Sequence, residues 1–179
     1  MKKTEIKEMI RSAIATRDYC ELQFRYHAEP LYCFPIAAGD RLFLGTEEKD
    51  FILDGFFIRR FRDVVRAKRI KDDKFVEIVR GEKLLEGLKV PPVDLGDWQN
   101  VFSSLKDMGH NIIIEKESLD AQESEYAIGK IVQVLHSKVR FRHFDADGVW
   151  RDEPYDIPYT DITSVTFSSR YVNIFSKYV

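Results

Sequence analysis

The residue types best suited to chemistry are histidine and cysteine, so their spacing is the first feature to test. The histidines are His27, His110, His136 and His143. No pair of them has the HExxH spacing, or another spacing that brings two imidazoles to one metal ion. Cys20 and Cys33 form no CxxC motif and have no further cysteine to pair with, so we expect two reduced, partly buried thiols. No histidine lies at motif distance from either thiol to activate it as a nucleophile. The sequence therefore predicts no catalytic residue, no metal and no cofactor.

Two other kinds of motif bear on calcium and phosphate binding. Asp145 to Gly148 reads DADG, like the start of a calcium loop, but such a loop needs flanking helices and a closing Glu where this chain has Asp156. The flanking residues are typical of strands, so we interpret DADG as a hairpin turn. Neither GxGxxG nor GxxxxGK occurs, so no backbone cradle for phosphate is evident. We expect a protein that is not an enzyme.

A basic segment from Phe56 to Lys74 mixes cationic side chains with aromatic and aliphatic ones. Such a mixture can contact a phosphate backbone and stack on bases. Residues 1–80 hold 17 basic and 14 acidic side chains, whereas the remainder hold 11 and 16. The alternative is a solvated strand face, or a contact with the acidic second half. The candidate nucleic-acid-binding residues are Arg59, Arg60, Arg62, Arg66, Lys68 and Arg69.

Composition limits the remaining classes. The chain has 179 residues, 44% of them hydrophobic, and a net charge of −2, which gives no overall attraction to nucleic acid or anionic lipid. No apolar run is long enough to span a bilayer. The first twenty residues interleave charges with apolar positions, unlike a signal peptide. We expect a cytoplasmic protein that does not enter the membrane.

Two amphipathic helices are predicted. TEIKEMIRSAIATRD, from Thr4 to Asp18, has apolar residues at helical spacing, with Thr4 as the candidate N-cap. DWQNVFSSLKDMG has the same pattern, with Asp97 as its candidate N-cap and Gly109 at its end. A short strand-like run follows each helix, at residues 20–26 and 111–117. A third, short helix is expected around residues 75–79.

The strand-rich regions after these runs are similar to each other, which suggests one unit used twice. RFRDVVRA, starting at Arg60, matches PYTDITSV, starting at Pro158, at an offset of 98 residues. At an offset of 97, residues 34–37 align with 131–134 and residues 42–44 with 139–141. Turns are expected at residues 38–40 and 136–138, and Gly55 and Gly148 supply positions with positive φ. Short strands with regular turns favour a small barrel in each half.

The predicted fold is therefore mainly β, of the α+β class, with two tandem helix-capped five-stranded small barrels. The first unit spans residues 1–81 and the second spans residues 97–179. Residues 82–96 form a linker, which contains the helix-breaking segment from Lys89 to Pro92. Proline stiffens a linker, so we expect the two units to keep a fixed relation.

This layout resembles the Sm-like and SH3-like small barrels, and residues 53–70 and 157–179 are similar to segments of an uncharacterised bacterial family. The Asp-x-Asn and Arg-Gly signatures with which Sm proteins hold uridine are absent, so no RNA-contacting residue is transferred. The first unit also resembles the WYL ligand-sensing barrel in FRYHAEP (residues 24–30), LFLG (residues 42–45) and the basic strand after Gly55, without the Trp-Tyr-Leu triplet. That likeness implies a small-ligand sensor, with a pocket around Arg25, Tyr26 and Arg41.

Aromatic residues concentrate near the C-terminus, where Tyr171, Phe175 and Tyr178 are candidate partner-binding residues. RYVNIFSKYV, the last ten residues, is predicted to be an edge strand that pairs with another copy of the chain. The favoured function is thus a non-catalytic binding protein that contacts a protein partner or itself as a homo-oligomer. RNA or DNA binding through residues 59–74 is the alternative, and a WYL-like ligand sensor is the second alternative.

Overall fold

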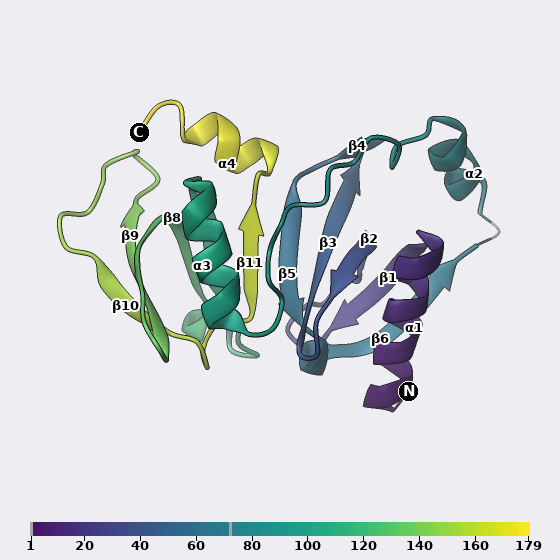
Figure 1. Cartoon of the computed structure of the whole chain (residues 1–179), viewed down its shortest axis with the longest axis horizontal. Helices are drawn as coiled ribbons and strands as arrows, with labels where there is room; N and C mark the ends of the chain where they lie inside the picture. Colours follow the sequence, from purple (N-terminus) through teal and green to yellow (C-terminus); the bar gives the residue numbers. More distant parts are fainter. Residues whose placement is uncertain (1, 72) are drawn as a thin grey trace.

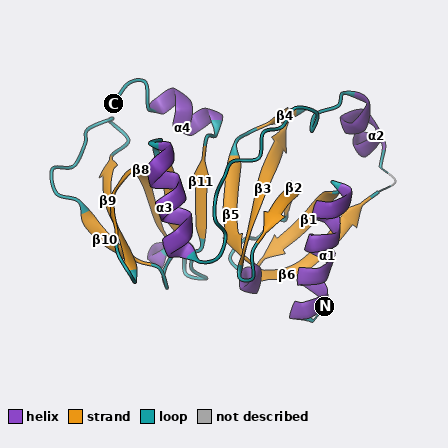
Figure 2. Cartoon of the chain, viewed as in Figure 1, coloured by secondary structure: helices purple, strands orange, loops and turns teal. Residues whose placement is uncertain are grey.

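The computed structural model describes residues 2–71 and 73–179, which form one antiparallel β-sheet with helices packed on it (Figures 1 and 2). The elements of the first half are α1 (Lys3–Thr16), β1 (Tyr19–Phe24), β2 (Leu31–Ala38), β3 (Leu42–Lys49), β4 (Ile52–Leu53), β5 (Phe56–Arg60), η1 (Phe61–Asp63), β6 (Val64–Ile70) and α2 (Lys74–Gly81). Those of the second half are α3 (Trp98–Met108), β7 (Ile112–Lys116), η2 (Ala121–Glu123), β8 (Glu125–Val134), β9 (Lys138–Phe144), β10 (Tyr155–Pro158), β11 (Ser164–Phe167) and α4 (Arg170–Phe175). The β-rich α+β class predicted from the sequence is confirmed.

The two predicted long helices are present and bury the apolar faces that their periodicity indicated. In α1 the buried residues are Ile6, Ile10 and Ala13. In α3 they are Trp98, Val101, Phe102 and Leu105. The N-cap prediction for α1 was wrong by two residues, because α1 begins at Lys3 and its N-cap is Lys2. For α3 it is confirmed: the Asp97 carboxylate accepts from the Asn100 N–H at 2.8 Å, and Gly109 ends the helix with φ of 72°.

The two halves of the sheet have the same strand order. In the first half the order is β6-β1-β2-β3-β5, and in the second it is β11-β7-β8-β9-β10. Each half begins with a helix. In each half the last strand pairs with the first, β6 with β1 and β11 with β7. The small strand β4 pairs only with β3 among the described residues.

The similar segments RFRDVVRA and PYTDITSV occupy equivalent places in this order. Each segment starts at the last residue of the fourth long strand of its half and crosses to the fifth. Ala67 lies opposite Leu22 in the β1·β6 ladder, and Val165 lies opposite Ile114 in the β11·β7 ladder. These four residues are buried. The offset of 98 thus matches the register of the structure.

The offset of 97 for the preceding hairpin is wrong by one residue. Ala38 pairs with Phe43 in the first half, and Val134 pairs with Val139 in the second. Phe43 and Val139 therefore correspond, at an offset of 96. Both hairpins contain a register shift near this point. A shift of one residue exchanges the two faces of a strand. Only the offset of 96 therefore places the buried side chains of Phe43 and Val139 on the same face, which α1 covers in the first half and α3 covers in the second.

The two halves are joined through the sheet, which is continuous and open. β5 of the first half pairs antiparallel with β11 of the second, so the sheet runs from β10 at one edge to β6 at the other (Figure 1). One hydrophobic cluster also crosses the junction, because Leu42, Leu44 and Ile58 pack with the α3 cluster. Two separate closed barrels are therefore not observed, because the strands at the boundary pair with each other.

The expected linker packs along this junction. The segment after α2 passes between the two halves to reach α3 (Figure 1), and Leu95 is buried in the shared cluster. A Cβ on Gly39 would lie 2.1 Å from the Leu95 carbonyl oxygen, so the β2–β3 turn and this segment are in close contact. α2 confirms the short helix expected around residues 75–79, with Val76 and Val79 buried.

The prediction for the C-terminus was wrong. Residues 170–175 form helix α4 and not an edge strand. The Ser169 hydroxyl caps this helix by accepting from the Val172 N–H at 3.3 Å, and Val172 is buried on the sheet beside Phe144. A Ser N-cap and the buried Val172 stabilise this short helix despite the strand-like composition.

No described helix is long and apolar enough to cross a membrane.

The junction makes a testable contribution to stability. Ile58 is fully buried and lies opposite Val165 across the β5·β11 ladder. We expect Ile58→Ala to lower the free energy of unfolding by about 3 kcal/mol, because the shared core cannot fill the space left behind. Chemical denaturation measures this loss. The matched control is Val132→Ala, whose side chain is partly exposed and whose expected cost is within about 0.5 kcal/mol. Equal costs for the two variants would contradict a core shared between the halves.

Candidate functional site

A cavity lies between the two halves, beside the junction. Its volume is about 560 Å³, within the range of small-molecule sites. Each half contributes the same three kinds of element. These are the start of its helix, the turn between its second and third long strands, and the turn that leads into its last strand. We call this cavity the junction pocket.

The junction pocket has an apolar floor and a polar rim. Leu42, Phe61 and Trp98 line it and are buried, with exposed fractions of 2%, 7% and 7%. Tyr159 also lines it, and its hydroxyl donates to the Leu135 carbonyl at 2.8 Å. Burial and the nearby charge of Asp97 raise the pKa of Tyr159 to about 12, so this phenol stays neutral.

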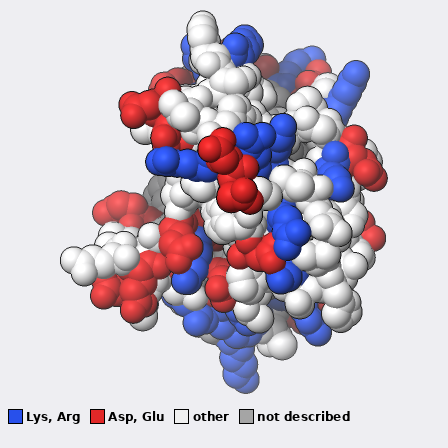
Figure 3. Space-filling view, turned by 90° about the vertical axis from the view of Figure 1, so that its left-hand side faces the viewer, with Lys and Arg blue, Asp and Glu red and all other residues white. Residues whose placement is uncertain are grey.

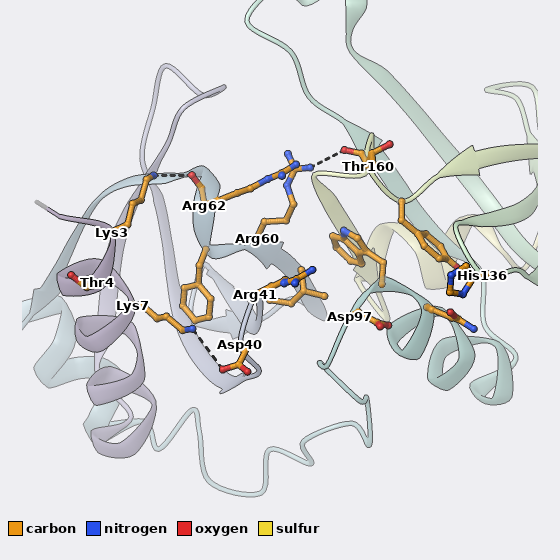
Figure 4. A pocket seen from close by; sticks show the side chains of 15 residues that line it. Lys3, Thr4, Lys7, Asp40, Arg41, Arg60, Arg62, Asp97, His136 and Thr160 are labelled. Carbon is orange, nitrogen blue, oxygen red and sulfur yellow. Dashed lines mark hydrogen bonds and ion pairs between the residues drawn. The ribbon is translucent and has the colours of Figure 1, made fainter.

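The rim carries five cationic side chains, all from the first half. They are Lys3, Lys7, Arg41, Arg60 and Arg62. Figure 4 shows Arg41, Arg60 and Arg62 reaching from the first half toward the space between the halves, opposite Asp97, His136 and Thr160. The acidic residues of the lining are Asp40 and Asp97. Cationic groups therefore outnumber acidic ones in the pocket.

Three of the five cations have partners within the protein. Lys3 Nζ donates to the carbonyls of Arg62 and Val64 at 2.7 and 2.6 Å. Lys7 Nζ lies 3.7 Å from the Asp40 carboxylate, and Arg60 forms an ion pair with Asp63. Burial and the nearby charge of Arg25 lower the pKa of Lys3.

Arg60 also connects the two halves directly. Its Nη1 donates to the Thr160 carbonyl at 3.2 Å, across the pocket (Figure 4). By contrast, the exposed side chains of Arg41 and Arg62 form no hydrogen bond or ion pair with any residue in the described part of the chain. These two guanidinium groups are available to a ligand.

The structure separates the six candidate nucleic-acid-binding residues. Arg59 and Arg60 are buried, with exposed fractions of 7% and 6%, because they form ion pairs inside the protein. Arg62 lies at the rim of the junction pocket. Arg66 and Lys68 are exposed on the edge strand β6, and Arg69 pairs with Asp18 at 3.2 Å. The six residues do not form one continuous cationic surface.

Arg59 belongs to a buried cluster that links the halves. Its Nη1 lies 2.9 Å from both carboxylate oxygens of Glu117, and its guanidinium lies 4.5 Å from the centre of the Phe24 ring. His27 Nε2 also forms a hydrogen bond with Glu117. Burial alone would raise the pKa of Glu117, but the hydrogen bond from His27 and the charge of Arg59 outweigh it and lower that pKa to about 2. Glu117 is therefore ionised and fixed, which suits a structural role.

The candidate partner-binding residues lie on or after α4. Tyr171 and Tyr178 are exposed, whereas Phe175 stacks on Phe144 at 5.2 Å and packs against the sheet. On the face of the second half seen in Figure 3, Lys and Arg side chains are interspersed with Asp and Glu. This face carries no large patch of a single charge.

The two cysteines lie together in the core, and the histidines join no metal-binding group among the described residues. No group of three or more His, Cys, Asp or Glu side chains that could hold a metal was found among residues 2–71 and 73–179. Cys20 and Cys33 lie opposite each other in the β1·β2 ladder, and both are fully buried as free thiols. Burial raises the pKa of Cys20 to about 12 and raises that of Cys33 well above its usual value.

Sequence reasoning found only part of the junction pocket. Of the residues expected to form a ligand pocket, Arg41 lines it, whereas Arg25 and Tyr26 are outside its lining. Lys3, Lys7 and Trp98 were missed, because the starts of the two helices that carry them line one pocket only after β5 pairs with β11. The one available signal in the sequence was that Lys3, Lys7 and Trp98 all lie at or near the start of the two predicted helices.

Comparison of the chain with protein-family models, with curated proteins and with solved structures gave no match.

The Arg59–Glu117 cluster predicts a pH-dependent stability. The pKa of Glu117 is lower in the folded state than the value of about 4.3 for an unfolded chain. Its contribution is therefore present above that value and is lost as the pH falls toward 2. We expect Glu117→Gln to cost roughly 3 kcal/mol at pH 7, and the difference from the parent chain to narrow between about pH 5 and pH 2.

Urea denaturation at several pH values measures this difference. Glu153→Gln, at an exposed position, is the control and should have little effect at any pH. A cost for Glu117→Gln that is the same at pH 7 and pH 3 would show that the carboxylate charge is not what stabilises the junction.

The buried thiols predict low reactivity. A disulfide reagent such as 5,5′-dithiobis(2-nitrobenzoate) reacts with an accessible thiolate. In the folded protein Cys20 and Cys33 are fully buried, and their raised pKa values keep both thiols protonated. We expect both thiols to stay unreacted until guanidinium unfolds the chain, when two equivalents should react. Rapid stoichiometric labelling of the native protein would be inconsistent with this burial.

Proposed function

We propose that the protein is a non-catalytic binding protein for a small organic anion, which it holds in the junction pocket. The observation that carries this proposal is one cavity of about 560 Å³ lined by five cationic side chains, two of them without a partner among the described residues. Guanidinium groups bind carboxylate and phosphate through paired hydrogen bonds. Arg41 and Arg62 therefore supply the donors for an anionic group.

Binding without chemistry fits the remaining lining. His136 is the one histidine of the lining, and no described carboxylate or hydroxyl forms a hydrogen bond with it. The carboxylate of Asp97 caps α3, and the hydroxyl of Tyr159 donates to a backbone carbonyl. No side chain of this lining is paired as a nucleophile with a base.

We further propose that the halves are two copies of one Sm-like or SH3-like small-barrel unit, fused into one open sheet. The identical strand order and the equivalent positions of RFRDVVRA and PYTDITSV support this proposal. The junction pocket would then be a site that neither copy has alone, since both contribute to its lining.

Self-association by adding a strand at β10 is less well supported. The Tyr159 N–H donates to the Ser137 carbonyl at 3.0 Å, so alternation along the strand directs position 158 away from β9. That outward position is proline, which has no N–H to donate. Asp156, which corresponds in register to Ile58 of the junction, pairs with Arg140 at 2.9 Å. Proline and charge are typical protections of a free sheet edge.

Thermal denaturation with a panel of compounds tests the proposed function. The panel contains citrate, glucose 6-phosphate and 1-naphthoate, with glucose and 1-naphthamide as uncharged counterparts. We expect at least one anion to raise the Tm, because a ligand that binds only the folded state stabilises it by mass action. Its uncharged counterpart should have a much smaller effect. Replacing both arginines, Arg41→Ala and Arg62→Ala, should weaken anion binding by at least tenfold.

The matched control is the double variant Arg66→Ala and Lys68→Ala, which removes the same charge from exposed positions outside the pocket. It should bind the anion as the parent does. If no anion of the panel raised the Tm, or if both double variants lost binding equally, the proposed site would be wrong. Nucleic-acid binding stays a prediction. Titration of the parent and of the Arg66→Ala and Lys68→Ala variant with single-stranded RNA at several salt concentrations tests it.

A further inference from the structure

We infer that the ligand of the junction pocket is amphipathic, with an apolar body and a single anionic head group. This inference rests on the proposed function and narrows its ligand class. It follows from the separation of the pocket into an apolar floor and a cationic rim.

The apolar floor offers no hydrogen bonds to a purely polar anion. Leu42, Phe61 and Trp98 present carbon surface to the cavity. A polar anion placed against this surface would lose water without gaining hydrogen bonds there. A hydrocarbon or aromatic body would instead remove the floor and itself from water together, which is favourable. Inorganic phosphate is also much too small to fill a cavity of about 560 Å³.

The charges of the rim limit the head group to one. Asp40 already offsets Lys7, Asp63 offsets Arg60, and Lys3 Nζ donates to two backbone carbonyls. Arg41 and Arg62 are left to meet the ligand, whereas a second or third anionic group would approach Asp40 or Asp97. The negative charge of such a group and that of Asp40 or Asp97 would repel each other. One carboxylate, sulfonate or phosphate monoester therefore fits the rim better than a polyanion does.

The two ends of the ligand have different neighbours across the junction. The cations belong to the first half, whereas Trp98, Tyr159 and His136 belong to the second. The head group should therefore lie on the first half and the body should lie toward α3. Arg60, which bonds the Thr160 carbonyl at 3.2 Å, lies between these two regions.

A pair of fluorescent probes tests this inference. 1-Anilinonaphthalene-8-sulfonate has an aromatic body and one anionic group, and N-phenyl-1-naphthylamine is the same body without the charge. Trp98 and Trp150 are the two tryptophans of the chain, so Trp150→Phe leaves the pocket residue as the sole donor for energy transfer. We expect the sulfonate probe to bind at least tenfold more tightly than the neutral probe, with energy transfer from Trp98.

Two variants locate the head group. Arg41→Ala with Arg62→Ala should weaken the sulfonate probe about tenfold or more and leave the neutral probe unchanged. Gln99→Glu should weaken only the sulfonate probe. It adds a negative charge to the lining in the first turn of α3, where a carboxylate does not destabilise the helix. The Arg66→Ala and Lys68→Ala control should bind both probes as the parent does.

The outcomes separate the two proposals. If citrate or inorganic phosphate bound as tightly as the sulfonate probe and with the same dependence on Arg41 and Arg62, the amphipathic class would be wrong and the anion site would stand. If the arginine variants changed the binding of no anion, both proposals would be wrong. Equal binding of the two probes would also overturn both, because the rim charges would then contribute nothing.

Discussion

The pairing of β5 with β11 is the interaction on which the rest of the structure depends. It is a four-residue antiparallel ladder between strands from opposite halves of the chain. Through it, two helix-and-strand units with the same strand order become one sheet with a shared core. It also lets the start of α1 and the start of α3 line one cavity, the junction pocket. The junction pocket depends on this ladder, because residues of both halves form its lining.

The junction explains why neighbouring arginines have different roles. Arg59 and Arg60 are adjacent on β5, so their side chains point to opposite faces of the sheet. Arg59 meets Glu117 of the second half, and Arg60 meets Asp63 and the Thr160 carbonyl. A buried charge must be paired, and each of these arginines is. Arg62, in the turn that follows, has no such partner among the described residues and faces the pocket.

The sequence predicted the elements better than their assembly. The apolar spacing of Ile6, Ile10 and Ala13 and the capping residue Asp97 are local signals, and they located both long helices. The match between RFRDVVRA and PYTDITSV correctly indicated equivalent positions. β11 pairs with β7 of its own half and also with β5. The second pairing joins residues about a hundred positions apart, and no local pattern reports it.

The error at the C-terminus has a physical cause. The last ten residues have a strand-like composition, but the cap from Ser169 and the burial of Val172 form a helical turn. For the basic segment the sequence left nucleic-acid binding and a solvated face open, because a list of charges does not show that Arg59 and Arg60 are buried while Arg62, Arg66 and Lys68 are exposed. Arg41, expected to line a ligand pocket, and Arg60 and Arg62, named as nucleic-acid-binding candidates, do line the junction pocket.

Amide hydrogen exchange tests the central claim most directly. The claim is that the β5·β11 ladder makes the two halves one cooperative body. The amides of β5 and β11 should then be protected as strongly as those of β1 and β7, and all four strands should open with the same free energy. Fast exchange in β5 and β11 while β1 and β7 stay protected would contradict the account, because the halves would then be independent and the pocket between them would not be held.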